Sequence, residues 1–205
     1  MYLGPFICHY VNMRWHRGIP VILAFTTIVW MCAGFSARAE QTKDPVPLEK
    51  AFVLWQQGYL LHLMGKYEEA IRSFSQSIDE HPTAEAYTFR GWSLSMLGRL
   101  KEAIAECKQA IRVDPDYGNP YNDIGVYLID LGRPDEAILW LEKALHAKRY
   151  CCYEYPRFNI GRVLLLKGRV AEAKRWFENA LVYEPGYEPA LKALELIREH
   201  GLEPI

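Results

Sequence analysis

Apolar residues recur at helical spacing, in paired segments, through most of the chain. In the first pair, one apolar run covers residues 51–64, Gly65 and Lys66 interrupt it, and a second amphipathic run covers residues 67–78. This spacing predicts two helices joined by a tight turn. The same layout returns three more times, in residues 84–114, 121–146 and 156–183. Prolines at positions 82, 115 and 185 follow three of the second segments and are expected to end them, since proline crowds the preceding turn.

Small residues stand at fixed places within these pairs. Each first segment contains a glycine, a second glycine closes the segment, and an alanine follows five residues later. The four sets are Gly58, Gly65 and Ala70; Gly91, Gly98 and Ala103; Gly125, Gly132 and Ala137; and Gly161, Gly168 and Ala173. Their first members are 33, 34 and 36 residues apart, a period typical of repeats that stack into a solenoid. Because glycine and alanine let helix backbones approach closely, we expect the paired helices to cross at these positions.

The repeated pattern resembles the tetratricopeptide repeat family. The resemblance is carried in the second repeat by Tyr87, Gly91, Leu94, Gly98, Ala103, Ala110 and Pro115, and in the fourth by Ile160, Gly161, Leu164, Gly168, Ala173, Phe177, Ala180 and Pro185. It implies an all-α fold, a right-handed superhelical solenoid of four helix pairs with a C-terminal capping helix. The implied repeats are residues 51–83, 84–117, 118–153 and 154–187, and the cap with its tail is 188–205.

Two departures from the family pattern have structural consequences. Ser77 stands where the first repeat should have a small apolar residue, and the third repeat ends in Lys148, Arg149 and Tyr150 without its proline. The third junction also has about two extra residues, so we expect a bend or shift of the stack at residues 150–155.

The resemblance further implies a concave groove formed by the first helices, which binds a partner. The family's contact positions place in it the residues Trp55, Tyr59, His62, Trp92, Met96, Asn122, Val126, Phe158 and Arg162. Only Asn122 and Arg162 are of the types with which chaperone-binding members hold a C-terminal carboxylate. A protein or peptide partner with apolar anchors is therefore expected instead. The alternative is that Trp55, Trp92 and Phe158 simply pack against neighbouring helices.

The N-terminal segment, residues 1–39, is predicted to be a signal peptide. A basic patch at residues 14–17 precedes an apolar run over residues 19–35, and Ala37 and Ala39 match the small-residue cleavage pattern. Cleavage after Ala39 predicts a periplasmic or secreted protein, with a linker over residues 40–50. The alternative is an uncleaved anchor in the inner membrane, the only case in which we expect membrane contact. Met13 is an alternative start to Met1.

The net charge and the absence of catalytic motifs narrow the classes of function that we expect. Removal of residues 1–39 takes away three arginines and no acid, which leaves 21 basic and 25 acidic side chains and a net charge of −4. Nucleic acid is therefore not an expected partner. Because no nucleophile elbow, phosphate loop, dinucleotide fingerprint or zinc-protease signature is present, we expect no enzyme activity and no cofactor. The sequence predicts an exported scaffold for protein–protein interactions in envelope complex assembly or, alternatively, an adaptor that delivers substrates to a periplasmic peptidase.

Three cysteines remain after the predicted cleavage. Cys107 occupies a large apolar position of a second helix and is expected to be a buried thiol. Cys151 and Cys152 are a candidate redox pair, which could form a disulfide with each other, pair with another chain or remain thiols. His146 lies close before them, but a structural zinc site needs four ligands, so no metal site is expected.

Overall fold

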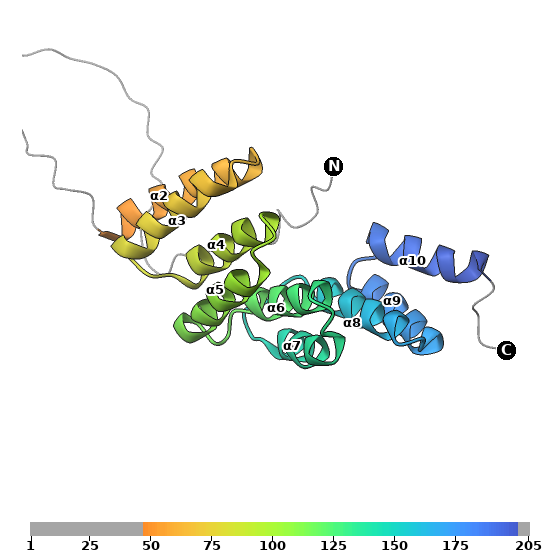
Figure 1. Cartoon of the computed structure of the whole chain (residues 1–205). Coiled ribbons are helices and arrows are strands. Elements are labelled where there is room, and N and C mark those ends of the chain that lie inside the picture. The colour runs from red at the N-terminus through yellow and green to blue at the C-terminus, as the bar shows by residue number, and fades with distance from the viewer. Residues whose placement is uncertain (1–46, 201–205) are drawn as a thin grey trace, which may run out of the picture. The chain divides into compact units, whose positions relative to one another are not determined.

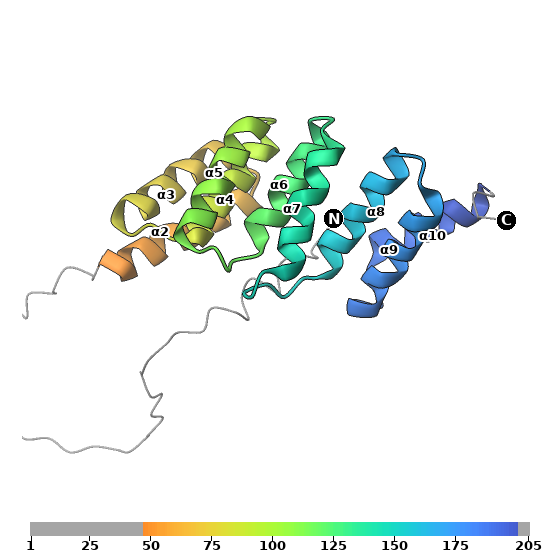
Figure 2. The same ribbon diagram turned by 90° about the horizontal axis from the view of Figure 1, so that it is seen from below.

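The computed structural model describes residues 47–200, which form a stack of antiparallel helix pairs (Figures 1 and 2). Its helices are α2 (Pro47–Leu63), α3 (Tyr67–Glu80), α4 (Ala84–Met96), α5 (Leu100–Val113), α6 (Asn119–Asp130), α7 (Pro134–His146), α8 (Glu154–Leu166), α9 (Val170–Tyr183) and α10 (Glu188–Glu199). Within residues 47–200 there is no strand beyond an isolated bridge between Tyr117 and Arg149. The predicted all-α helical solenoid is confirmed. No helix of this part of the chain is both long and apolar enough to span a membrane.

The N-terminal predictions lie almost entirely outside the described residues. This holds for the signal peptide or anchor over residues 1–39, the cleavage site after Ala39 and most of the linker. The exception is the end of the linker, because α2 begins at Pro47. Proline fits the first turn of a helix, where its missing N–H has no intrahelical partner, and Glu49 adds a favourable charge there. Residues 47–50 are therefore helical.

A glycine follows the first helix of each pair because the turn to the second helix needs a left-handed backbone. The φ angles of the four turn glycines, Gly65, Gly98, Gly132 and Gly168, lie between 70° and 74°. At the first turn, the N–H of Lys66 donates to the carbonyl of Leu61 at 2.9 Å, which satisfies one of the last carbonyls of α2. A side chain at these positions would be strained even though the surrounding space is open.

The other column of small residues marks where the two helices of a pair cross. A Cβ atom on Gly58 would lie 2.8 Å from the ring of Phe74, and one on Gly161 would lie 2.4 Å from the ring of Phe177. The repeated alanines Ala70, Ala103, Ala137 and Ala173 are all fully buried. The expected close crossing is confirmed, and the space is filled by rings beside Gly58 and Gly161 and by the Leu141 side chain beside Gly125.

The junction between α7 and α8, residues 147–153, is the longest connection between repeats. Arg149 fixes it, since its guanidinium lies 2.6 Å from Glu85, 2.7 Å from Asp114 and 4.1 Å above the Tyr117 ring. The N–H of Arg149 also donates to the carbonyl of Asp116 at 2.8 Å. The junction without a proline is thus tied to the preceding repeats by charge and hydrogen bonds.

Candidate functional site: the inner face of the first helices

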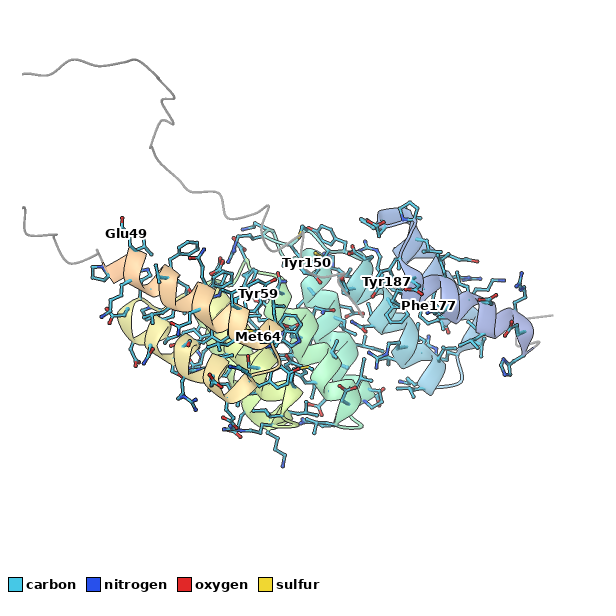
Figure 3. All side chains as sticks on the ribbon, turned by 90° about the horizontal axis from the view of Figure 1, so that it is seen from above. Glu49, Tyr59, Met64, Tyr150, Phe177 and Tyr187 are labelled. Atoms are coloured by element: carbon cyan, nitrogen blue, oxygen red, sulfur yellow. The ribbon has the colours of Figure 1, made fainter. Side chains whose placement is uncertain are left out.

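The predicted contact residues come from four helices that touch in series, α2 with α4, α4 with α6, and α6 with α8. We call this surface the inner face and define it by those residues: Trp55, Tyr59, His62, Trp92, Met96, Asn122, Val126, Phe158 and Arg162. Figure 3 labels Tyr59 on α2 and Tyr187 and Phe177 near the C-terminal end of the stack. The inner face divides into two halves of different chemistry.

In the N-terminal half, the rings pack against one another. Trp55 is only 6% exposed, its ring stacks on Tyr59 with centroids 5.5 Å apart, and the edge of Phe89 meets it at 5.3 Å. We call the group Phe52, Trp55, Tyr59, Phe89 and Trp92 the aromatic cluster. It belongs to the core of the first two repeats, together with the fully buried Phe74. Trp55 therefore packs against neighbouring helices, which was the alternative to a contact with a partner.

His62 is also buried, at 6% exposure, beneath the ring of Trp92, whose centroid lies 4.2 Å away. The hydroxyl of Ser93 donates to the carbonyl of Phe89, so the oxygen of Ser93 accepts from Nδ1–H of His62 at 2.9 Å. This arrangement sets the tautomer of the imidazole. Burial lowers the pKa of His62 to about 4, so the ring is neutral at physiological pH. His62 serves as a neutral core residue that links α2 to α4.

Phe158, at the other end of the inner face, packs towards the cap. Its ring lies 5.4 Å from Phe177 of α9 and 5.5 Å from Tyr187, which precedes α10. These contacts place one side of the half-buried ring against neighbouring helices.

The C-terminal half is polar, and its hydrogen bonds run from α6 to α8. The Nδ2 of Asn159 donates to Oδ1 of Asn122 at 3.1 Å, and Nη1 of Arg162 donates to Oδ1 of Asn159 at 3.0 Å. Arg162 also lies 3.8 Å from the carboxylate of Asp130. We call Asn122, Asn159, Arg162 and Asp130 the polar chain. Arg162 is half-buried and Asp130 is exposed, so the chain reaches the surface.

Beside the polar chain, Asp123 has a perturbed carboxyl group. Burial raises its pKa to about 7, and the hydrogen bond from Nδ2 of Asn122, at 3.5 Å, opposes that rise only in part. Asp123 and Asn159 were not among the predicted site residues. The sequence does contain a signal, because Phe89, Asp123 and Asn159 occupy the same position of successive repeats.

Exposed apolar side chains line the last turns of the first helices. Leu63 is 47% exposed, Met96 51% and Leu166 67%, and Asp130 holds the equivalent position in α6. Val126 of α6 is half-buried. Of the predicted contact residues, Met96 is exposed, and Tyr59, Trp92, Val126, Phe158 and Arg162 are half-buried. Trp55, His62 and Asn122 are buried, at 6%, 6% and 9% exposure.

The cysteines have two different environments. Cys107 is fully buried, as expected, and burial raises the pKa of its thiol well above the usual value, which makes it a poor nucleophile. The sulfur atoms of Cys151 and Cys152 lie 3.1 Å apart in the junction. Cys152 is buried and Cys151 is partly accessible. Their redox role stays a prediction. Within residues 47–200, no group of three or more His, Cys, Asp or Glu side chains could hold a metal ion.

Comparison with known families identifies the repeat. Two models of the tetratricopeptide repeat family match this chain, over residues 57–120 and 121–149. This part of the chain consists of tetratricopeptide repeats. A tetratricopeptide repeat protein of Bacillus subtilis, YpiA, is 28% identical over 135 residues, which are 65% of this chain and 31% of YpiA. The chain spans only 14% to 31% of the first curated relatives that it matches, so their other activities do not transfer to it.

Solved structures extend the similarity beyond the residues matched by the family models. The Pseudomonas aeruginosa protein PilF has a TM-score of 0.70 at 22% identity, covering 76% of this chain and 71% of that protein. MamA has a TM-score of 0.59 at 26% identity, covering 69% and 81%. PilF supports the tetratricopeptide fold alone at that identity. Tetratricopeptide repeats are scaffolds for protein–protein interaction, and that is the general function of this solenoid.

Proposed function

We propose that this protein is an exported scaffold that binds an extended segment of a partner protein along the inner face, in the assembly of an envelope complex. The observation that carries the proposal is that the polar chain reaches the surface at Arg162 and Asp130, while the last turns of α4 and α8 expose Met96 and Leu166. The guanidinium of Arg162 donates and the carboxylate of Asp130 accepts, so the pair matches the C=O and N–H groups of a peptide backbone. Side chains of this chemistry suit a partner's main chain, and the apolar last turns suit its apolar anchors.

The polar chain can take up a partner at its accessible end. The ion pair of Arg162 and Asp130 joins a half-buried and an exposed side chain, and such a pair contributes only about 0–1 kcal/mol. A partner that supplies equivalent groups replaces this contact without opening the buried pair of Asn122 and Asn159. The aromatic cluster lacks this freedom because opening it would expose core rings.

The expected affinity is modest. A partner that buried roughly 500 Å² of apolar surface would gain about 12 kcal/mol, and the loss of motion on association costs about 4–15 kcal/mol. We therefore expect reversible binding in the micromolar range. The predicted signal sequence and the acidic remainder of the chain support a role in the envelope rather than with nucleic acid.

Photo-crosslinking in intact cells tests the binding surface. A photoreactive residue at Met96 or Leu166 should capture a partner, which mass spectrometry identifies, and adding Asn159→Ala or Arg162→Ala should reduce the yield severalfold. The matched control is Leu139, a 59% exposed apolar residue on the second helix α7. Capture of the same partner at Leu139, or unchanged capture after both substitutions, would contradict binding at the inner face.

The N-terminus of the protein from cells tests export separately. Mass spectrometry should find a chain that begins at Glu40. A chain that still begins at Met1 or Met13 would contradict cleavage and favour the anchor, without affecting the result at the inner face.

A further inference from the structure

The first helix of the solenoid has an uncovered side where every later repeat is covered. In α4, α6, α8 and α10, two residues seven positions apart are buried where the helix packs on the preceding repeat. These pairs are Ala86 and Ser93, Pro120 and Tyr127, Pro156 and Val163, and Ala190 and Ile197, of which Tyr127 is the most exposed at 5%. On α4, Ser93 accepts from His62 of α2, and Arg90, between the two, donates to Ser75 of α3 at 3.0 Å, so this side of α4 meets both helices of the preceding repeat.

In α2 the equivalent residues are Val53 and Leu60, and they are 60% and 59% exposed. Gln57 lies between them, and Met64, which is 67% exposed, continues the line beyond the helix. We call Val53, Gln57, Leu60 and Met64 the end face. Figure 3 labels Met64 and Tyr59 along this helix. Spacings of four, three and four residues are those of a seam between two helices. Most of the end face is therefore apolar surface with the geometry of a helix contact.

The opposite end of the solenoid is finished differently. The cap helix α10 exposes charged pairs, with Lys192 lying 2.6 Å from Glu188 and Arg198 3.8 Å from Glu195. Terminal repeats with polar outer faces keep solenoids from associating. On α10 the exposed Leu191 (46%) and Leu196 (54%) alternate with these charged residues, whereas the end face carries no charged residue.

We propose that the end face binds the end face of a second copy of this chain, in a two-fold symmetric dimer whose two α2 helices run antiparallel. In this arrangement Val53 of one copy packs against Leu60 of the other, and Gln57 lies near the axis opposite its symmetry mate. Two glutamine amides can donate to and accept from each other. One polar residue in an apolar seam also fixes the register of the helices.

Charge favours a second end face over the α10 end of another copy as the partner of the end face. Head-to-tail stacking would press the uncharged end face against the ion pairs of α10 and remove water from them, which is costly. Two end faces meet without like-charge repulsion. Self-pairing also closes after two copies, the commonest symmetry of oligomers, whereas head-to-tail contacts would continue into filaments. The proposal does not depend on what the inner face binds.

Cysteine crosslinking of the full chain tests the antiparallel register. Gln57→Cys should give a covalent dimer with a short bis-maleimide, and Val53→Cys should link efficiently only when co-expressed with Leu60→Cys. The unsubstituted chain and Leu139→Cys measure the background from the native cysteines. The proposal is overturned if Gln57→Cys gives no more dimer than these controls, or if Val53→Cys links to itself as well as to Leu60→Cys.

Sedimentation of the purified full chain tests the dimer itself. The chain should pass from monomer to dimer as its concentration rises from about 1 to 100 μM, since an interface of this size is weak. Leu60→Glu should weaken the dimer at least about ten-fold, because it places two unpaired carboxylates in an apolar seam. Leu139→Glu is a matched control, as both leucines are 59% exposed. A monomeric chain, or equal effects of the two substitutions, would overturn the proposal. So would protection of Leu60→Cys from maleimide in a monomer, which would place another segment on the end face.

Discussion

The two halves of the inner face use the same repeat positions for different purposes. Phe89 in the second repeat, Asp123 in the third and Asn159 in the fourth are equivalent, yet Phe89 is a core ring and Asn159 is a link in the polar chain. Rings in the first half contact one another across α2 and α4, whereas amides in the second half join α6 to α8. The comparison shows that an aromatic residue at a contact position of a solenoid need not be available to a partner. Here the polar chain reaches the surface at Arg162 and Asp130, whereas its two asparagines are buried.

Phe89→Ala should break the aromatic half and have the largest effect. Phe89 is 2% exposed and its ring lies 5.3 Å from Trp55, 5.4 Å from Tyr59 and 5.7 Å from Trp92. The cavity should lower the free energy of unfolding by about 3–5 kcal/mol, measured by urea denaturation. Asn159→Ala in the polar half should cost about 1–2 kcal/mol, since Arg162 can turn to water. Equal losses from the two changes would mean that the halves do not differ as described.

His62 should make the aromatic half sensitive to acid. Its pKa is about 4 in the folded chain and 6.5 in the unfolded chain, so acid favours the unfolded state, which takes up a proton first. Stability is full above about pH 6.5 and should fall by about 3 kcal/mol as the pH decreases to 4. Denaturation at a series of pH values measures this loss. His62→Gln keeps a donor for Ser93 without a titrating group, and it should show less dependence on pH in that range.

Asp123 should give the polar half the opposite, smaller dependence on pH. Its pKa is about 7 in the folded chain against the usual 3.8, so the folded chain holds a proton that the unfolded chain has lost. Its contribution to stability therefore decreases as the pH rises from 3.8 to 7. The Asp123 residue is only half-buried, so the effect should be smaller than its pKa alone implies. Above pH 7, Asp123→Asn should gain stability relative to the unsubstituted chain. Denaturation at a series of pH values, with His62→Gln measured alongside, tests this. If both variants shift the profile in the same direction, the proposed contrast of the two groups is wrong.

The sequence predicted the scaffold better than the inner face, for a physical reason. The crossing glycines and alanines repeat in every helix pair, and each is determined by its own pair, so the column alone predicts the close approach. Burial of an inner-face residue depends instead on the neighbouring repeat. Trp55 is covered because α4 supplies Phe89, and Asn159 is paired because α6 supplies Asn122. Such pairings join positions that a single repeat does not contain. The contact positions implied by the family resemblance therefore included Trp55, His62 and Phe158 and omitted Asn159.

Trp55→Phe should change stability least and distinguish ring packing from polar contact in the aromatic half. The Nε1 of Trp55 is buried and has no hydrogen-bond acceptor among the described residues. A phenyl ring keeps most contacts with Phe52, Tyr59 and Phe89 and removes this unpaired donor, whose burial costs about 1–3 kcal/mol. The gain offsets the lost ring volume, so the free energy of unfolding should change by less than about 1 kcal/mol. Trp55→Ala, measured beside it, should cost about 3–5 kcal/mol because the whole ring is lost. A large loss from Trp55→Phe would show that the indole N–H has a partner, and that the first half of the inner face, like the second, is organised by a polar contact.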